Sequence, residues 1–156
     1  MNAKKLFTAF LAAAALTTFT LPALADQDPI ADRLAILEKT DWKNMKSIAI
    51  ELDEFSYTPN KLEFESGQAY KLTIKNIGEK KHYFTATEFF KAIATRKVES
   101  KKDAEIKVPY LVALELMANG GELDLYFVPI IKGTYSVFCT IDDHKKEGME
   151  GTITIK

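Results

Sequence analysis

Apolar residues occupy every second position over much of this chain, a period that extended strands produce and helices do not. The first such run starts at Lys46, where Ile48, Ile50 and Leu52 are separated by more polar or smaller residues. The same alternation returns at Leu62 to Phe64, Tyr70 to Ile74, Leu123 to Phe127, Tyr135 to Cys139 and Ile153 to Ile155. Glycine, proline and asparagine lie between the runs, as turns require. Short strands at this spacing predict a β-sandwich.

Two segments depart from this period. Near the N-terminus, Asp28 and Pro29 resemble a helix cap and first turn, and apolar residues then recur at helical spacing towards Trp42, at Ile30, Leu34 and Leu37. This pattern predicts an amphipathic helix that packs on the body of the protein or forms a loose extension.

The second departure lies between Tyr83 and Gly121. Thr85 and Glu88 have the spacing of a capping box, and Phe89 and Ile93 lie on one face of the short helix that it would start. We expect Phe89 and Phe90 to be core residues rather than a docking surface. The charged residues Lys101 to Asp103 are typical of an exposed hairpin or loop.

The first 25 residues have the pattern of a secretory signal peptide. Lys4 and Lys5 precede an apolar run that ends in the small-residue signature of Ala23 and Ala25. We therefore expect a leader over 1–25, a helical extension over 26–45 and a folded domain over 46–156, without a stable membrane anchor. The leader holds two of the 21 basic residues and none of the 22 acidic ones, so the remainder carries a formal charge of −3. This balance argues against nucleic-acid binding.

Cys139 is the only cysteine, so no disulfide can form within the chain. A single thiol in an exported protein calls for an explanation. Cys139 is followed after four residues by His144, and His144 after four more by Met149. A strand that delivers the cysteine, and a loop that returns the other two side chains, would place all three around one point. His82, at the start of another strand, could supply a fourth ligand.

This set of residues is typical of a blue-copper site. Two imidazoles and a thiolate, with a long and weak thioether bond, hold both Cu(I) and Cu(II). A metal-bound thiolate is also shielded, which would explain why Cys139 survives export. Zinc is disfavoured because thioether is a poor zinc ligand. A cysteine hydrolase also uses Cys and His, but Met149 and the β-rich context do not support one. Taken separately, each residue could simply be structural.

Two segments resemble those of the cupredoxins, the plastocyanin and azurin family. GTYSVFCTIDDHKKEGMEGTITIK resembles the closing strand, ligand loop and last strand, and KNIGEKKHYF resembles the segment with the first histidine. The resemblance covers roughly Ser47 to Tyr83 and Gly121 to Lys156. It implies an all-β Greek-key sandwich with one copper on His82, Cys139, His144 and Met149, and His144 as the electron port.

The resemblance has departures as well as matches. Asp142 and Asp143 stand where the family often has proline and glycine, and Tyr83 stands where an asparagine often ties the two ligand segments together. The segment from Thr85 to Gly120 exceeds a minimal cupredoxin and could cover one side of the site. We expect these changes to influence the reduction potential.

From these residues we expect a monomeric periplasmic protein that shuttles single electrons between redox partner proteins and is not an enzyme. The alternative is a periplasmic copper chaperone or copper-resistance carrier, which uses similar soft ligands but exchanges its metal. A copper oxidase or reductase would need a second metal site, and the chain has only two histidines.

Overall fold

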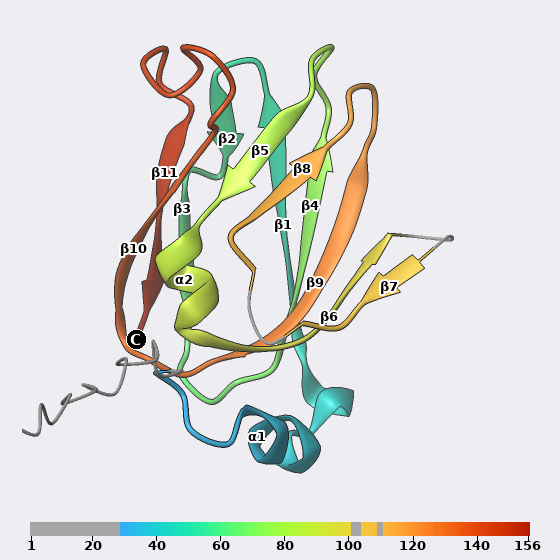
Figure 1. Cartoon of the computed structure of the whole chain (residues 1–156), viewed down its shortest axis with the longest axis vertical. Helices are drawn as coiled ribbons and strands as arrows, with labels where there is room; N and C mark the ends of the chain where they lie inside the picture. The colour runs from blue at the N-terminus through green and yellow to red at the C-terminus, as the bar shows by residue number, and fades with distance from the viewer. Residues whose placement is uncertain (1–28, 101–103, 109–110) are drawn as a thin grey trace, which may run out of the picture.

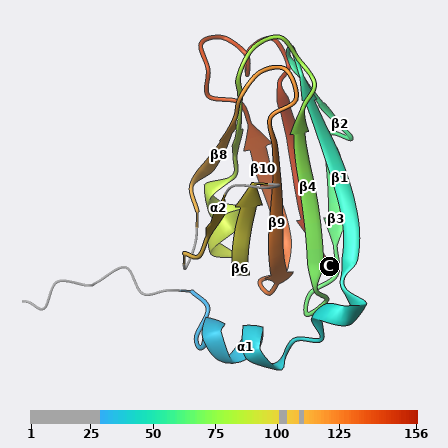
Figure 2. The same cartoon turned by 90° about the vertical axis from the view of Figure 1, so that its right-hand side faces the viewer.

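Two β-sheets face each other across an apolar core in the computed structural model, which describes residues 29–100, 104–108 and 111–156 (Figures 1 and 2). The expected sandwich is confirmed. The expected leader over 1–25 and the charged residues Lys101 to Asp103 lie outside the described residues.

Neighbouring strands in one sheet are, in order, β2 (Ser56–Thr58), β1 (Lys46–Asp53), β4 (Tyr70–Asn76), β9 (Glu122–Pro129), β6 (Ile93–Ser100) and β7 (Ala104–Ile106). The order in the other sheet is β3 (Lys61–Phe64), β11 (Glu150–Ile155), β10 (Gly133–Phe138), β5 (His82–Thr85) and β8 (Ala113–Leu116). β1 pairs in parallel with β4, and β3 with β11, because the chain crosses between the sheets before it returns. All six alternating runs of the sequence lie in strands, except that β10 ends one residue before Cys139.

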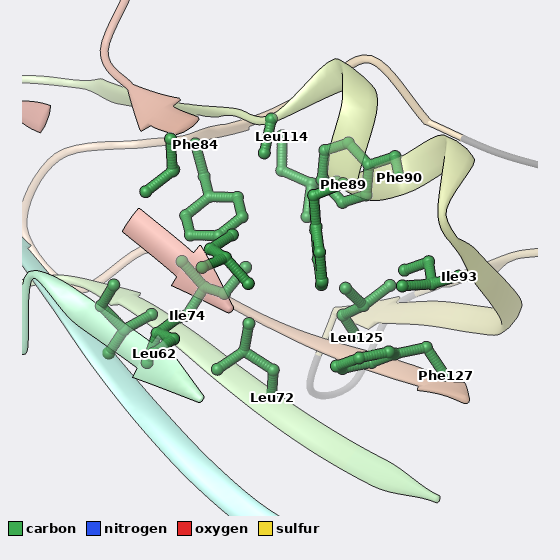
Figure 3. Close-up of a cluster of buried hydrophobic side chains, with 14 of the residues drawn as sticks. Leu62, Leu72, Ile74, Phe84, Phe89, Phe90, Ile93, Leu114, Leu125 and Phe127 are labelled. Atoms are coloured by element: carbon green, nitrogen blue, oxygen red, sulfur yellow. The ribbon is translucent and has the colours of Figure 1, made fainter. Parts of the chain in front are cut away.

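The core is made of the inward side chains of both sheets and of the helix α2 (Thr87–Lys91), as Figure 3 shows. Phe64 contacts both Phe89 and Phe127, with ring centroids 5.9 and 5.1 Å apart. Phe89 and Phe90 are both 0% exposed, which confirms that they are core residues. These two side chains anchor α2 to the core directly after the end of β5.

The N-terminal helix is shorter than expected and uses a different face. It spans α1 (Arg33–Lys39), and a separate 3-10 turn covers η1 (Trp42–Asn44). The expected apolar face was wrong at Leu34, which is 76% exposed, whereas Arg33 is buried. The Arg33 guanidinium donates hydrogen bonds to the backbone carbonyls of Ile93 and Lys91. Those carbonyls need donors that an apolar side chain could not supply.

The segment after β5 contains the expected short helix, but the expected capping box was wrong. Thr85 belongs to β5, and Ala86 precedes the helix without a side-chain cap. Ile93 lies in β6 and not on the helix, because it pairs with Pro129 of β9. β6 pairs antiparallel with β7 on either side of residues 101–103, which themselves lie outside the described residues. Within the described residues, no helix is long and apolar enough to cross a membrane.

Candidate metal centre

The four candidate ligands come from the end of the sandwich opposite α1 (Figure 1). His82 is the first residue of β5, and Cys139 follows directly after β10. His144 and Met149 lie in the loop that joins β10 to β11. The strands β5 and β10 fix His82 and Cys139, and the loop from β10 to β11 returns His144 and Met149 to the same end.

The three nitrogen and sulfur donors lie close together. One ligand atom each from His82, Cys139 and His144 falls within 4.8 Å of the others. The Sγ atom of Cys139 is 3.5 Å from Nδ1 of His144, and the two imidazole centroids are 5.1 Å apart. Among the described residues this is the one such cluster of histidine, cysteine and acidic side chains.

All four side chains are buried. The exposed fractions are 0% for His82, 1% for Cys139, 5% for His144 and 0% for Met149. His144 is therefore the least covered of the four, and its ring meets that of Phe55 edge to face at a centroid distance of 5.2 Å.

Backbone hydrogen bonds hold the ligand loop in shape. The Cys139 amide donates to the Met149 carbonyl over 3.1 Å, and the Met149 amide donates to the His144 carbonyl over 2.9 Å. The loop turns back through Gly148, whose φ of 105° lies in the left-handed region that favours glycine. Each of the three ligands in the loop is thus tied to another by the main chain.

His82 has the properties of a metal ligand. Burial lowers the pKa of His82, and the nearby His144 lowers it further, against the opposing effect of the Glu54 carboxylate. Neither ring nitrogen has a hydrogen-bond partner among the described residues. A fully buried imidazole without partners is costly unless something else satisfies it. A metal ion at the cluster would do so.

Tyr83 supports Cys139 through its backbone. The Tyr83 amide donates to Sγ of Cys139 over 3.4 Å, and the Tyr83 carbonyl accepts a hydrogen bond from the Tyr57 hydroxyl. The expected difference at Tyr83 therefore leaves a direct link between the two ligand segments. A main-chain contact of this kind has no side-chain signature, so the sequence could not indicate it.

Asn76 is a supporting residue that the sequence did not reveal. Its side chain is 0% exposed and donates to the carbonyls of Lys80, Leu116 and Met117. Its Oδ1 accepts a hydrogen bond from the Gly78 amide. Asn76 thereby fixes the turn that leads into His82 against the end of β8. An asparagine at a strand end looks like any turn residue in the sequence.

The segment from Thr85 to Gly120 contributes to both sheets. β8 pairs with β5, with Leu116 opposite His82, and β6 extends the other sheet beyond β9. The strand β8 therefore covers the His82 side of the site, as expected.

The donor set fits copper. A thiolate, two imidazoles and an adjacent buried thioether combine soft and borderline ligands that suit both oxidation states of copper, whereas closed zinc sites rarely use methionine. With two packed β-sheets and such a cluster at one end, this protein has the features of a copper-binding β-sandwich protein.

The chain belongs to the cupredoxin-like domain family, which matches residues 10–155. One copper ion is accordingly its cofactor. No curated protein sequence matches the chain significantly.

Solved structures share the fold at low sequence identity. Dithionite-reduced auracyanin from the photosynthetic bacterium Roseiflexus castenholzii is 21% identical, with a TM-score of 0.51 over 70% of this chain and 96% of that one. A multicopper oxidase from Pseudomonas thermotolerans is 15% identical, with a TM-score of 0.55 over 76% of this chain and 31% of that one. A copper-containing nitrite reductase from Thermus scotoductus is 10% identical, with a TM-score of 0.54 over 70% and 30%. These similarities show the fold.

Proposed function

We propose that this protein is a periplasmic one-electron carrier with a mononuclear type 1 copper site formed by His82, Cys139, His144 and Met149. The observation that carries the proposal is the buried cluster of three donor atoms within 4.8 Å, on two strand ends and one hydrogen-bonded loop. Bound copper supplies the redox chemistry by cycling between Cu(I) and Cu(II).

The protein residues contribute rigidity and exclusion of water. Cys139 and His82 are fixed by strands of the same sheet, and the main chain ties His144 and Met149 to the cysteine. Ligands held in this way change position little when the charge of the site changes. A small geometric change favours rapid electron exchange, and burial keeps solvent ligands from the site.

Of the four candidate ligands, His144 lies nearest the surface. It is the most exposed of the four residues at 5%, and the Phe55 ring beside it is 37% exposed. We propose that electrons enter and leave through His144, at the surface where redox partner proteins would dock.

Copper delivery is the second candidate function, and the burial of the site argues against it. A chaperone presents mobile ligands that a partner can capture one by one, whereas all four side chains here are at most 5% exposed. An oxidase or reductase would require a second metal site, and both histidines of the chain are already in the first.

A Cu(I) chelator separates the carrier from the chaperone. The copper-loaded protein is reduced, mixed with excess chelator, and followed both for copper loss and for electron exchange with a soluble redox protein. Fast exchange with slow loss supports the carrier. Rapid loss of Cu(I) with poor exchange would make copper delivery the better assignment.

The periplasmic location is supported by the leader pattern over 1–25. The intact mass of the exported protein should correspond to a chain that begins at Asp26. A protein that keeps its leader in the mature form would contradict the proposed location.

A further inference from the structure

The two-residue turn between β1 and β2 contacts both histidines of the site. Glu54 and Phe55 form this turn, which is closed by the pairing of Asp53 with Ser56. The Glu54 carboxylate faces His82, and the Phe55 ring faces His144. Phe55 has a φ of 64°, a left-handed conformation that is strained for a bulky residue. Such strain persists where the surrounding structure requires it, often at functional sites.

The Glu54 carboxylate is held in place from two sides. Its Oε1 accepts a hydrogen bond of 2.8 Å from the Lys80 backbone amide. On the other side, Gly78 leaves room for it, because a Cβ atom at Gly78 would lie 2.6 Å from Glu54 Oε2. The turn that leads into His82 therefore provides both a donor and a space for this carboxylate.

The carboxylate faces the Nε2 edge of the His82 ring. Its Oε1 is 3.5 Å from Nε2 of His82, a charge contact slightly too long for a well-formed hydrogen bond. The two nitrogens of an imidazole point in different directions, so a ring whose Nε2 faces Glu54 directs Nδ1 elsewhere. Neither nitrogen has a hydrogen-bond partner among the described residues, but Nε2 faces the Glu54 carboxylate, so we assign Nδ1 to the metal.

Glu54 itself lies outside the group of donor atoms that fall within 4.8 Å of one another. Its place is thus behind a ligand and not among the ligands. Metal-bound histidines commonly donate their other ring N–H to a carboxylate, which fixes the ring orientation and raises the basicity of the ligand.

We propose that Glu54 is a positioning residue of the copper site, which holds the Nε2–H of His82 and places one negative charge behind this ligand. The inference rests on the proposed function, because it concerns the same copper. A fixed negative charge favours Cu(II) over Cu(I), which carries one positive charge less. Glu54 therefore lowers the reduction potential of the site.

Three variants and one control test this inference. Glu54→Gln removes the charge but keeps the shape, Glu54→Ala removes both, and Gly78→Ala displaces the carboxylate without altering it. Glu79→Gln is the control, which removes an equal charge from an exposed residue next to Gly78. The readouts are the Cu(II) affinity by competition, the reduction potential by voltammetry, the EPR spectrum, and the thermal unfolding of each metal-free protein.

We expect Glu54→Gln to weaken Cu(II) binding about tenfold, within the range usual for partners of a ligating histidine. If Cu(I) binding is unchanged, the potential rises by about 59 mV, the one-electron equivalent of a tenfold change. Glu54→Ala should have at least this effect, and Gly78→Ala should shift the potential in the same direction. Glu79→Gln should leave the reduction potential close to that of the wild type. All four metal-free variants should be folded and show a cooperative thermal unfolding transition.

Equal potentials for Glu54→Gln, Glu79→Gln and the wild type would overturn the inference. An EPR spectrum of Glu54→Gln that shows the loss of a copper ligand would also overturn it, because Glu54 would then bind copper itself. A failure of the proposed function looks different. In that case the wild-type protein would itself lack the spectrum of a copper thiolate.

Discussion

Sγ of Cys139 lies 3.5 Å from Nδ1 of His144, although the two residues are separated by a loop that must reverse the chain. The loop achieves this because the main chain of Met149 bonds to both Cys139 and His144. The spacing of Cys139, His144 and Met149 in the sequence is therefore the spacing that one hydrogen-bonded loop requires.

Removal of the His144 imidazole should create a site that external ligands can fill. We expect His144→Gly to bind copper with an altered visible spectrum and added imidazole to restore a spectrum close to that of the wild type. His82→Gly should respond less to imidazole, because His82 is 0% exposed and lies deeper than His144. The measurement is an imidazole titration of both copper-loaded variants. An equal response would contradict the placement of His144 nearest the surface.

Replacement of Met149 should change redox behaviour more than stability. Met149→Leu is close to volume-conserving, so we expect it to fold with a loss below about 1.5 kcal/mol. It should keep copper but shift the reduction potential, because the Met149 thioether would be a weak ligand that tunes the metal. Met117→Leu is the control, since Met117 is 62% exposed. Cyclic voltammetry that gives one potential for all three proteins would remove Met149 from the ligand set.

Asn76→Ala should loosen the turn before His82. The substitution removes the side-chain donor to the carbonyls of Lys80, Leu116 and Met117. The Met117 carbonyl keeps a hydrogen bond from the Gly121 amide. A buried polar group that loses its partner costs about 1–3 kcal/mol, and we expect a loss of this size in the free energy of unfolding. Denaturant unfolding of the metal-free protein measures it, with the exposed Asn60→Ala as control. A variant as stable as this control would show that the three bonds contribute little.

The sequence predicted the parts of the fold that repeat and missed the parts that depend on single contacts. The alternating runs around Ile50, Leu72 and Leu125 identified the core strands, because burial on one face of a sheet imposes period two. The predicted buried face of α1 was wrong because the Arg33 guanidinium donates hydrogen bonds to two carbonyls distant in the sequence, which no local pattern encodes.

The site shows the same division. Cys139, His144 and Met149 are close in the sequence and belong to scarce residue types, so their spacing indicated a metal site. Glu54 and Asn76 are common residues that reach the site only after the strands are assembled. The strand β2 was missed because three residues are too few for a clear period. The strand β8 was missed although Leu114 and Leu116 alternate as Leu62 and Phe64 of β3 do.

Phe89→Ala should separate core packing from the function of the site. Phe89 packs between Phe64 and Phe127 and is 0% exposed, so its truncation should cost about 3–5 kcal/mol of unfolding free energy. The visible spectrum of the folded copper-loaded variant should stay unchanged. Leu34→Ala, at a residue that is 76% exposed, should cost less than about 0.5 kcal/mol. A Phe89→Ala protein of wild-type stability would contradict the described core.

The central claim is that one copper ion binds to the thiolate of Cys139, and a visible absorption titration with Cu(II) tests it most directly. The wild-type protein should develop an intense thiolate-to-copper band that saturates at one equivalent, and Cys139→Ser should develop none, because serine cannot form the copper–sulfur bond. A band that saturates at two equivalents, or one that persists in Cys139→Ser, would contradict the account.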